Sequence, residues 1–280
     1  MLRDEQIAFY HRLGYLHVPD VLTSSEVTAL QTACELEPQG EVLGVPEFMA
    51  IPLHERLLAV VRDLLGKQIV YFGESSARYA IPAVKADRHF HVDARADDLD
   101  YRKDYPLLRV AFYLEDYASY SGGLKVRPGS WKQPPLFTLG PKRFVRYLLR
   151  TRNVAALTQR RSVNVPTKPG DLAIWNLRTH HAGYGMRLKV WPSHSFWPQI
   201  EKRIPRFLML PEPTTRRVVF ITYGAPSEYL EKYFANRLNR DNMQAHWQHS
   251  SFATPELAIL AKQRGVELWT EGSDGARTEA

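Results

Sequence analysis

A single cysteine, Cys34, is present in a chain of 280 residues. One thiol cannot form an intrachain disulfide, and it excludes a zinc site built on several thiolates. The chain also lacks any run of about 18 uncharged apolar residues, which is the length that a membrane-spanning helix needs. Charges interrupt residues 1–18, so no secretory signal is recognisable there. These absences predict a cytoplasmic protein.

Acidic residues are in the minority. The chain has 37 Lys and Arg against 30 Asp and Glu, which gives a formal net charge of +7. Such an excess is compatible with nucleic acid, an anionic membrane or an anionic small molecule as a partner. The bases cluster in two stretches and no nucleic-acid-binding module is recognisable, so we expect no nucleic-acid partner. With 44% hydrophobic residues, the chain has an ordinary globular composition and can bury a large core.

Helical periodicity dominates the first quarter of the chain. Apolar residues recur at helical spacing, glycines follow two of the helical patterns, and Thr23 with Glu26 forms a capping box. The helices and one short strand predict an N-terminal helical layer over residues 1–66. They are expected at 3–13, 15–18 (the strand), 23–34 and 53–65.

Strand patterns dominate residues 68–224. Their spacing is irregular, βαβ alternation is absent, and the chain has 19 prolines. These features favour a mainly β protein with flanking helices (α+β), folded as an antiparallel barrel or sandwich. The expected strands are 68–72, 75–81, 90–93, 107–114, 123–127, 171–175 and 217–223.

After the last strand, residues 226–239 and 254–264 are expected to be C-terminal helices. Residues 271–280 have the composition of a disordered tail. Neither an internal repeat nor an interdomain linker is visible. The sequence therefore predicts one domain over residues 1–270.

Two stretches interrupt the strand pattern. Residues 141–161 contain seven bases and no acid, and on a helix the apolar and basic side chains would take separate faces. Such a helix could pack on the sheets with its arginines solvated, or could dock on anionic lipid through residues 141–152. Residues 184–215 combine tryptophan and phenylalanine with five prolines. A long aromatic loop of this kind is typical of a functional lid.

The stretch HFHVD, residues 89–93, offers metal ligands. Alternation along a strand sends residues i and i+2 to one face, so His91 and Asp93 can point into the same cavity. An imidazole and a carboxylate are two of the three ligands of a 2-His-1-carboxylate iron site. The same tripeptide is common in surface turns, and His89 shares the face of His91, so a shifted register is an alternative.

A third ligand would have to come from a later histidine. Residues 171–175 form an apolar strand pattern that runs into His180 and His181. Two adjacent histidines at a strand exit cannot both face inward. The residue pattern alone leaves the choice between them open.

Five blocks follow one another in a recognisable order: FYHRLGYLHVPDVLTSSEVTAL, HVD, LRVAFYLEDYASYSGGLKVRPGSWK, PGDLAIWNLRTHHAG and RRVVFITYG. Together they span about residues 7–224. In content and order they resemble the phytanoyl-CoA dioxygenase (PhyH-like) family of Fe(II)/2-oxoglutarate-dependent oxygenases. The resemblance implies a double-stranded β-helix, also called a jelly roll, with Fe(II), 2-oxoglutarate and O2 as the reacting partners.

By position in these blocks, the resemblance implies His91, Asp93 and His181 as the catalytic metal ligands, with His180 as the rival of His181. Arg216 would bind the distal carboxylate of 2-oxoglutarate, with Arg217 second, since an arginine fork can grip a carboxylate with two hydrogen bonds.

The chain departs from the family pattern in places. His181 and Arg216 are 35 residues apart, which is longer than the family's usual spacing, and Trp131 replaces the histidine of the PGSH block. A further 2-oxoglutarate contact is expected from residues 74–78. The carboxylate of Asp93 also argues against halogenation, because halogenating relatives have a small residue in its place.

The reaction implied is hydroxylation of an unactivated C–H bond, with release of succinate and CO2. Eight bases between residues 178 and 217, interleaved with aromatics, indicate a small anionic substrate. A natural-product intermediate, a nucleotide, a sugar, a lipid-linked sugar or an acyl thioester would each fit. The alternative is a non-catalytic or membrane-surface member of the same fold that binds a glycolipid or acyl chain. The sequence identifies neither the substrate nor the oligomeric state.

Overall fold

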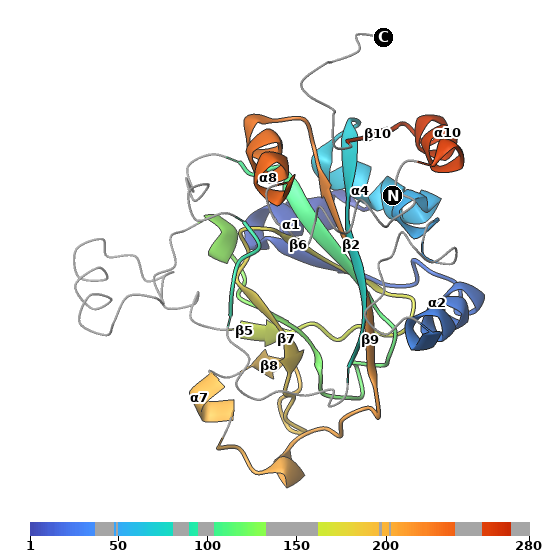
Figure 1. The fold of residues 1–280 in the computed structure, drawn as a ribbon. Helices are drawn as coiled ribbons and strands as arrows, with labels where there is room; N and C mark the ends of the chain where they lie inside the picture. The colour runs from blue at the N-terminus through green and yellow to red at the C-terminus, as the bar shows by residue number, and fades with distance from the viewer. Residues whose placement is uncertain are drawn as a thin grey trace, which may run out of the picture.

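The computed structural model of the chain describes residues 1–36, 48, 50–80, 90–94, 104–132, 162–195, 198–201, 203–238 and 254–269. Within these residues the protein is a mixed α+β molecule with two sheets (Figure 1). The basic stretch 141–161 with its predicted membrane contact, the tail 271–280 and His89 lie outside the described residues. Among the described helices, none combines the length and apolarity that a membrane crossing requires.

The N-terminal helices occupy the residues that their caps predict. They are α1 (Asp4–Leu13), α2 (Ser24–Leu36) and α4 (Glu55–Leu65), the last preceded by the 3-10 turn η2 (Ile51–Leu53). Gly14 ends α1 in the left-handed region, with a φ of 76°. At the start of α2 the Thr23 amide donates to the Glu26 carboxylate over 2.7 Å. The predicted helices are confirmed.

Six strands form the larger sheet, in the order β1-β6-β3-β9-β2-β10. All neighbouring strands are antiparallel except β10, which runs parallel to β2. The N-terminal layer therefore contributes the edge strand β1 to this sheet. The bounds are β1 Tyr15–Val18, β2 Ile69–Ala80, β3 Leu107–Tyr113, β6 Leu172–Asn176, β9 Arg216–Gly224 and β10 Val266–Leu268.

Four short antiparallel strands form the smaller sheet, in the order β7-β4-β5-β8. Helix α7 follows β8, and the ammonium of Lys125 on β4 contacts the carboxylate of Glu201 on α7 over 2.5 Å, with both side chains buried. The 3-10 turns are η4 and η6. The bounds are β4 Gly123–Val126, η4 Ser130–Lys132, β5 Ser162–Asn164, β7 His181–Gly185, β8 His194–Ser195, α7 Pro198–Glu201 and η6 Arg206–Leu208.

The two faces of the larger sheet are covered differently. One face packs against α1, α2 and α4 in an apolar cluster that includes Leu30, Leu58 and Val110. The opposite face packs against the smaller sheet, in a cluster that includes Ala111 and Val126. Successive strand residues point to opposite faces, so β3 contributes to both clusters. We call the second region the inter-sheet space.

C-terminal helices cover the end of the larger sheet. Helix α8 (Glu228–Leu238) packs Leu230 and Tyr233 against Val70 and Phe72 of β2. Helix α10 (Pro255–Gln263) begins at a Thr254 cap and leads into β10. Both helices lie within the predicted ranges, so these predictions are confirmed.

Several predicted strands differ from the structure. The prediction of a strand over residues 90–93 is wrong. In this segment only His91 pairs with another strand, through an isolated bridge to His181, and one bridge does not make a strand. The strands predicted at 68–72 and 75–81 are one strand, β2, with a bulge between Tyr71 and Ser75. Strands β5, β7, β8 and β10 were not predicted, since they are short and lack alternation. The predicted lid over 184–215 begins inside β7 and contains β8, α7 and η6.

Candidate metal centre

The segment that carries His91 and Asp93 is held against strand β7 by its backbone. His91 and His181 exchange two backbone hydrogen bonds of 3.0 and 2.9 Å, which form the isolated bridge. The amides of Asp93 and Ala94 both donate to the Leu177 carbonyl over 2.9 Å. Two segments distant in the sequence therefore lie side by side.

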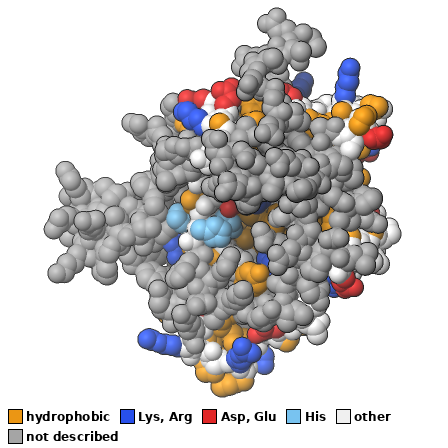
Figure 2. Space-filling view, in the orientation of Figure 1, with side chains coloured by type: hydrophobic (Ala, Val, Ile, Leu, Met, Phe, Trp, Pro, Cys, Tyr) orange, Lys and Arg blue, Asp and Glu red, His pale blue; other side chains and the backbone are white. Residues whose placement is uncertain are grey.

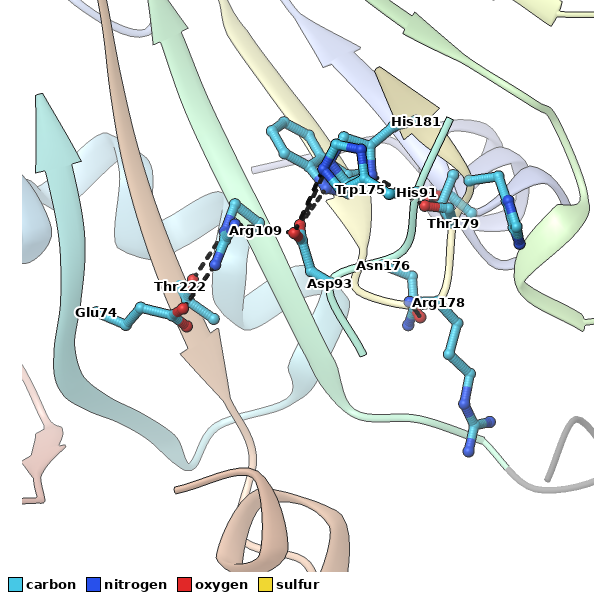
Figure 3. Close-up of polar contacts among 12 residues, drawn as sticks. Glu74, His91, Asp93, Arg109, Trp175, Asn176, Arg178, Thr179, His181 and Thr222 are labelled. Atoms are coloured by element: carbon cyan, nitrogen blue, oxygen red, sulfur yellow. Dashed lines mark hydrogen bonds and ion pairs between the residues drawn. The ribbon is translucent and has the colours of Figure 1, made fainter. Parts of the chain in front are cut away.

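The side chains of His91, Asp93 and His181 converge. One ligand atom from each lies within 4.8 Å of the others. The Asp93 carboxylate oxygens lie 3.4 Å from His181 Nε2 and 4.0 Å from His91 Nε2. The two imidazole rings have centroids 4.4 Å apart (Figure 3). The predicted triad is thus brought together by the fold.

His181 is oriented by a backbone carbonyl. Its Nδ1 donates to the Thr179 carbonyl over 3.0 Å, and a carbonyl can only accept. In the neutral ring, Nε2 then carries a lone pair directed toward Asp93. Burial, followed by the charge of His91, lowers the pKa of His181 to about 4, although Asp93 opposes the shift. A neutral, oriented imidazole is the form that binds a metal ion.

Asp93 is held as a carboxylate. Its burial would raise its pKa, but Arg109 first, then His181 and His91, together with a hydrogen bond from Trp175, lower that pKa to about 2. The Trp175 indole donates to Oδ2 over 3.2 Å, and Arg109 Nη1 lies 3.1 Å from Oδ1. Both oxygens of the carboxylate are therefore oriented by donors on the larger sheet.

The centre opens to solvent on the side of His91. Its side chain is 48% exposed, whereas those of Asp93 and His181 are 9% and 6% exposed. Figure 2 shows histidine side chains at the surface, with apolar, basic and acidic atoms nearby. A small molecule can reach this side of the triad.

His180 faces away from the cluster. Its ring is buried, its amide donates to the Ser130 hydroxyl over 2.9 Å, and it is not part of the converging ligand set. Burial, then the nearby charge of Arg127, lowers the pKa of His180 to about 3. Its side chain is thus a neutral component of the packing behind β7.

The two candidate arginines for 2-oxoglutarate point in opposite directions. Arg217 contacts Glu115 over 2.7 Å and Glu35 of α2 over 2.6 Å, on the face of the sheet that the N-terminal helices cover. Arg216 is 2% exposed, and among the described residues no carboxylate pairs with it. Its Nε donates to the Gly122 carbonyl over 3.1 Å.

The described surroundings of Arg216 are aromatic rather than acidic. Its guanidinium lies over the rings of Tyr184 and Tyr113, at 4.2 and 5.3 Å from their centroids. Gly183 lies against it, since a Cβ there would be 3.1 Å from Nη2. Tyr184 adopts a φ of 62°, a strained value for this residue type that places its ring on the arginine.

Sequence reasoning missed Arg109. This residue contacts Asp93, yet it had no place in the family pattern. Its signal was a single charge within the apolar strand LLRVAFY, where a buried charge needs a partner. Glu74, in the range expected to contact 2-oxoglutarate, pairs with Arg109 over 2.8 Å.

Some of the eight bases between residues 178 and 217 serve the fold. Arg178, which precedes the lid, is buried between the rings of Tyr105 and Tyr229. Arg187 is buried and donates to backbone carbonyls. The described lid bases that are exposed are Lys189, Arg203 and Arg206. The basic character of the lid therefore carries less weight for an anionic substrate than its sequence indicated.

No protein-family model matches the sequence, and no curated protein matches it. Solved structures do. HygX from Streptomyces hygroscopicus is 20% identical, with 80% of this chain and 87% of HygX covered and a TM-score of 0.53. The chain has the same fold. SnoK, a non-heme alpha-ketoglutarate-dependent carbocyclase from nogalamycin biosynthesis, is 19% identical over 80% and 84% of the two chains, with a TM-score of 0.52.

A third structure, AviO1 from Streptomyces viridochromogenes Tue57, is 16% identical. The match covers 81% of this chain and 97% of AviO1, with a TM-score of 0.52. HygX has been solved with iron bound, and also with nickel and 2-oxoglutarate bound. At these identities the likeness concerns the fold.

Proposed function

We propose that the protein is a non-haem Fe(II)/2-oxoglutarate-dependent oxygenase, built as a double-stranded β-helix from its two facing sheets. The observation that carries this proposal is the convergence of His91, Asp93 and His181 within 4.8 Å. Two imidazoles and one carboxylate are the donor set of ferrous oxygenases, which leaves further positions open for a co-substrate and O2.

The local electrostatics fit a cation among these three side chains. The lone pair on Nε2 of neutral His181 faces a carboxylate oxygen of Asp93 at 3.4 Å. Two acceptors in that position repel each other unless a proton or a metal ion lies between them. His91 Nε2 adds a third atom that could bind the metal ion, from the solvent-exposed side. The residues present therefore fit a divalent metal ion.

Arg216 is the proposed binding residue for the distal carboxylate of 2-oxoglutarate. A buried guanidinium without a carboxylate partner is costly, and an anionic ligand offsets that cost. Arg217 already has two carboxylate partners, which supports the choice of Arg216. When bound, ferrous iron and 2-oxoglutarate together supply oxidation by O2 with release of succinate and CO2.

The substrate that we propose is a small molecule of the natural-product type, oxidised by hydroxylation at an unactivated C–H bond. HygX has been solved with hygromycin B bound, and SnoK comes from nogalamycin biosynthesis. The half-exposed His91 places the open side of the triad where such a molecule can approach. Since SnoK is a carbocyclase, hydroxylation is the part of the proposal that product analysis must test.

The test is an anaerobic titration of the full chain with Fe(II) and 2-oxoglutarate, followed by succinate release in air with a panel of glycosides and polyketides. We expect a charge-transfer absorption band in the wild type that is absent from His91→Ala and His181→Ala. His180→Ala is the matched control, and it should keep the band. A band that persists in both triad variants would contradict the assignment of the ligands.

A further inference from the structure

The three proposed metal ligands are anchored unequally. His181 belongs to the ladder of β7, and His91 is fixed by its two-way backbone bridge to His181. Asp93 lies on no strand, and its backbone is attached only through the Leu177 carbonyl among the contacts of the described residues. The orientation of its carboxylate therefore depends on side-chain contacts.

Those contacts come from a rigid platform on the larger sheet. Arg109, in the central strand β3, lies directly across from Trp175 of β6 on one side and Thr222 of β9 on the other. Directly opposed residues point to the same face, so all three project into the inter-sheet space. Arg109 and Trp175 each hold one oxygen of Asp93.

Each nitrogen of the Arg109 guanidinium has its own acceptor, as Figure 3 shows. Nε donates to the Thr222 hydroxyl over 3.0 Å, Nη2 donates to Glu74 over 2.8 Å, and Nη1 lies 3.1 Å from Asp93. This use of the planar fork cannot be reproduced by a lysine, which has a single nitrogen. The side chain is thus fixed in one position.

Glu74 completes the arrangement. The bulge in β2 lies at this residue, and the Tyr233 hydroxyl of α8 donates to the Glu74 carboxylate at 2.9 and 3.1 Å. With one arginine between two carboxylates, the group of Glu74, Arg109 and Asp93 keeps a net negative charge. Without Glu74, the arginine would cancel the charge of Asp93 and repel a metal cation.

We propose that Arg109 is the positioning residue of the Asp93 carboxylate and that Glu74 is its counter-charge, which lets an arginine hold a metal ligand without weakening metal binding. This inference rests on the proposed metal site. It concerns Arg109 and Glu74, which would influence metal binding only through their effect on Asp93. Outer contacts of this kind typically change metal affinity by about 10- to 100-fold.

The experiment measures Co(II) affinity of the full chain from the visible absorption of the bound ion, without 2-oxoglutarate or turnover. Arg109→Met should weaken Co(II) binding by about 10- to 100-fold, and Glu74→Gln by about 10-fold. In the Arg109→Met background, Glu74→Gln should not change Co(II) affinity further, because the positive charge that Glu74 compensates is gone. A purely structural role would instead weaken Co(II) binding only in variants whose thermal stability falls as well.

Arg217→Met and Glu115→Gln are matched controls. Arg217 has two carboxylate partners and a similar side-chain exposure, 15% against 16% for Arg109, but its pairs lie on the face that the N-terminal helices cover. Both controls should bind Co(II) as the wild type does. Thermal unfolding of every variant identifies any loss of fold. If one of the variants does not fold, Tyr233→Phe is measured in its place, and its Co(II) affinity should fall by a few-fold.

The outcomes separate this inference from the proposed function. If Co(II) binds equally to the wild type and to Asp93→Ala, the proposed metal site is wrong. If Asp93→Ala loses Co(II) but Arg109→Met and Glu74→Gln bind it normally, or their losses simply add, the roles assigned to Arg109 and Glu74 are wrong.

Discussion

The two faces of the larger sheet have nearly opposite chemistry. The face under the N-terminal helices is an apolar cluster with residues such as Leu58 and Val110 fully buried. The inter-sheet face also has an apolar cluster, but Asp93, Arg109 and Arg216 project into the same space. Alternation along each strand lets one sheet stabilise the fold on one side and hold charged groups on the other. Substitutions on the two faces should therefore separate stability from binding.

Leu58→Ala should give the largest loss of stability. Leu58 lies in α4 and is fully buried against the larger sheet. Removing a buried leucine side chain costs about 2–5 kcal/mol, since a cavity remains. We expect this loss in chemical denaturation, with Co(II) affinity unchanged. A weaker metal site in the folded variant would show that the two faces are coupled.

Arg216→Met should act on the other face. Losing the buried guanidinium should weaken 2-oxoglutarate binding by about 100-fold, or roughly 2.7 kcal/mol, because the distal carboxylate loses its charged partner. Metal affinity without 2-oxoglutarate should stay near that of the wild type. The measurement is a titration of the charge-transfer band with 2-oxoglutarate. Arg217→Met is the control, and an equal effect there would reverse the assignment.

Asp171→Asn should have a smaller, pH-dependent effect on stability. The carboxylate accepts hydrogen bonds from His17 and from the amides of Lys168 and Asp20, at 2.7–3.1 Å. Burial opposes ionisation, yet these bonds lower the pKa of Asp171 overall. Its contribution is therefore present above the ordinary Asp pKa of about 3.9 and is lost as the pH falls through the lower folded value.

At neutral pH this substitution should cost about 1–3 kcal/mol. The difference from the wild type should shrink in unfolding experiments below about pH 4. A difference that stays constant with pH would mean that the carboxylate charge contributes nothing.

Charge reversal on the lid should have the smallest effect. Arg203 and Arg206 are exposed, and the pair of Arg206 with Glu212 is largely solvated. Arg203→Glu with Arg206→Glu should leave stability within about 0.5 kcal/mol and raise the Michaelis constant only if the substrate is anionic. An unchanged Michaelis constant for the true substrate would remove the anionic-substrate hypothesis. The measurement is steady-state succinate release.

Local signals made the helices predictable. Gly14, the Thr23–Glu26 contacts and Gly66 mark helix ends in the sequence, and the structure places the helix ends there. The strands were harder, because pairing joins distant residues and leaves little local trace. Strand β7, with the sequence HAGYG, has no alternation, and its place is set by β4.

The site was predictable where a motif spans few residues. Spacing in HFHVD placed His91 and Asp93 on one side, although the expected strand is a single bridge. The choice between His180 and His181 came from resemblance, because both follow the same strand and are adjacent. Arg109 and Glu74 could not be connected from the sequence, since their contact depends on the order of strands in the sheet.

The strand order also has a consequence for how the chain folds. Strand β1 pairs with β6, and β3 pairs with β9, so the central contacts join residues far apart in the sequence. Topologies dominated by such contacts fold slowly, on the order of milliseconds to seconds. During synthesis His91 and Asp93 emerge well before β9 can complete the sheet. Because Thr222 of β9 accepts a hydrogen bond from Arg109, we expect the proposed metal site to form after β9 docks, and so after the helices, in refolding experiments.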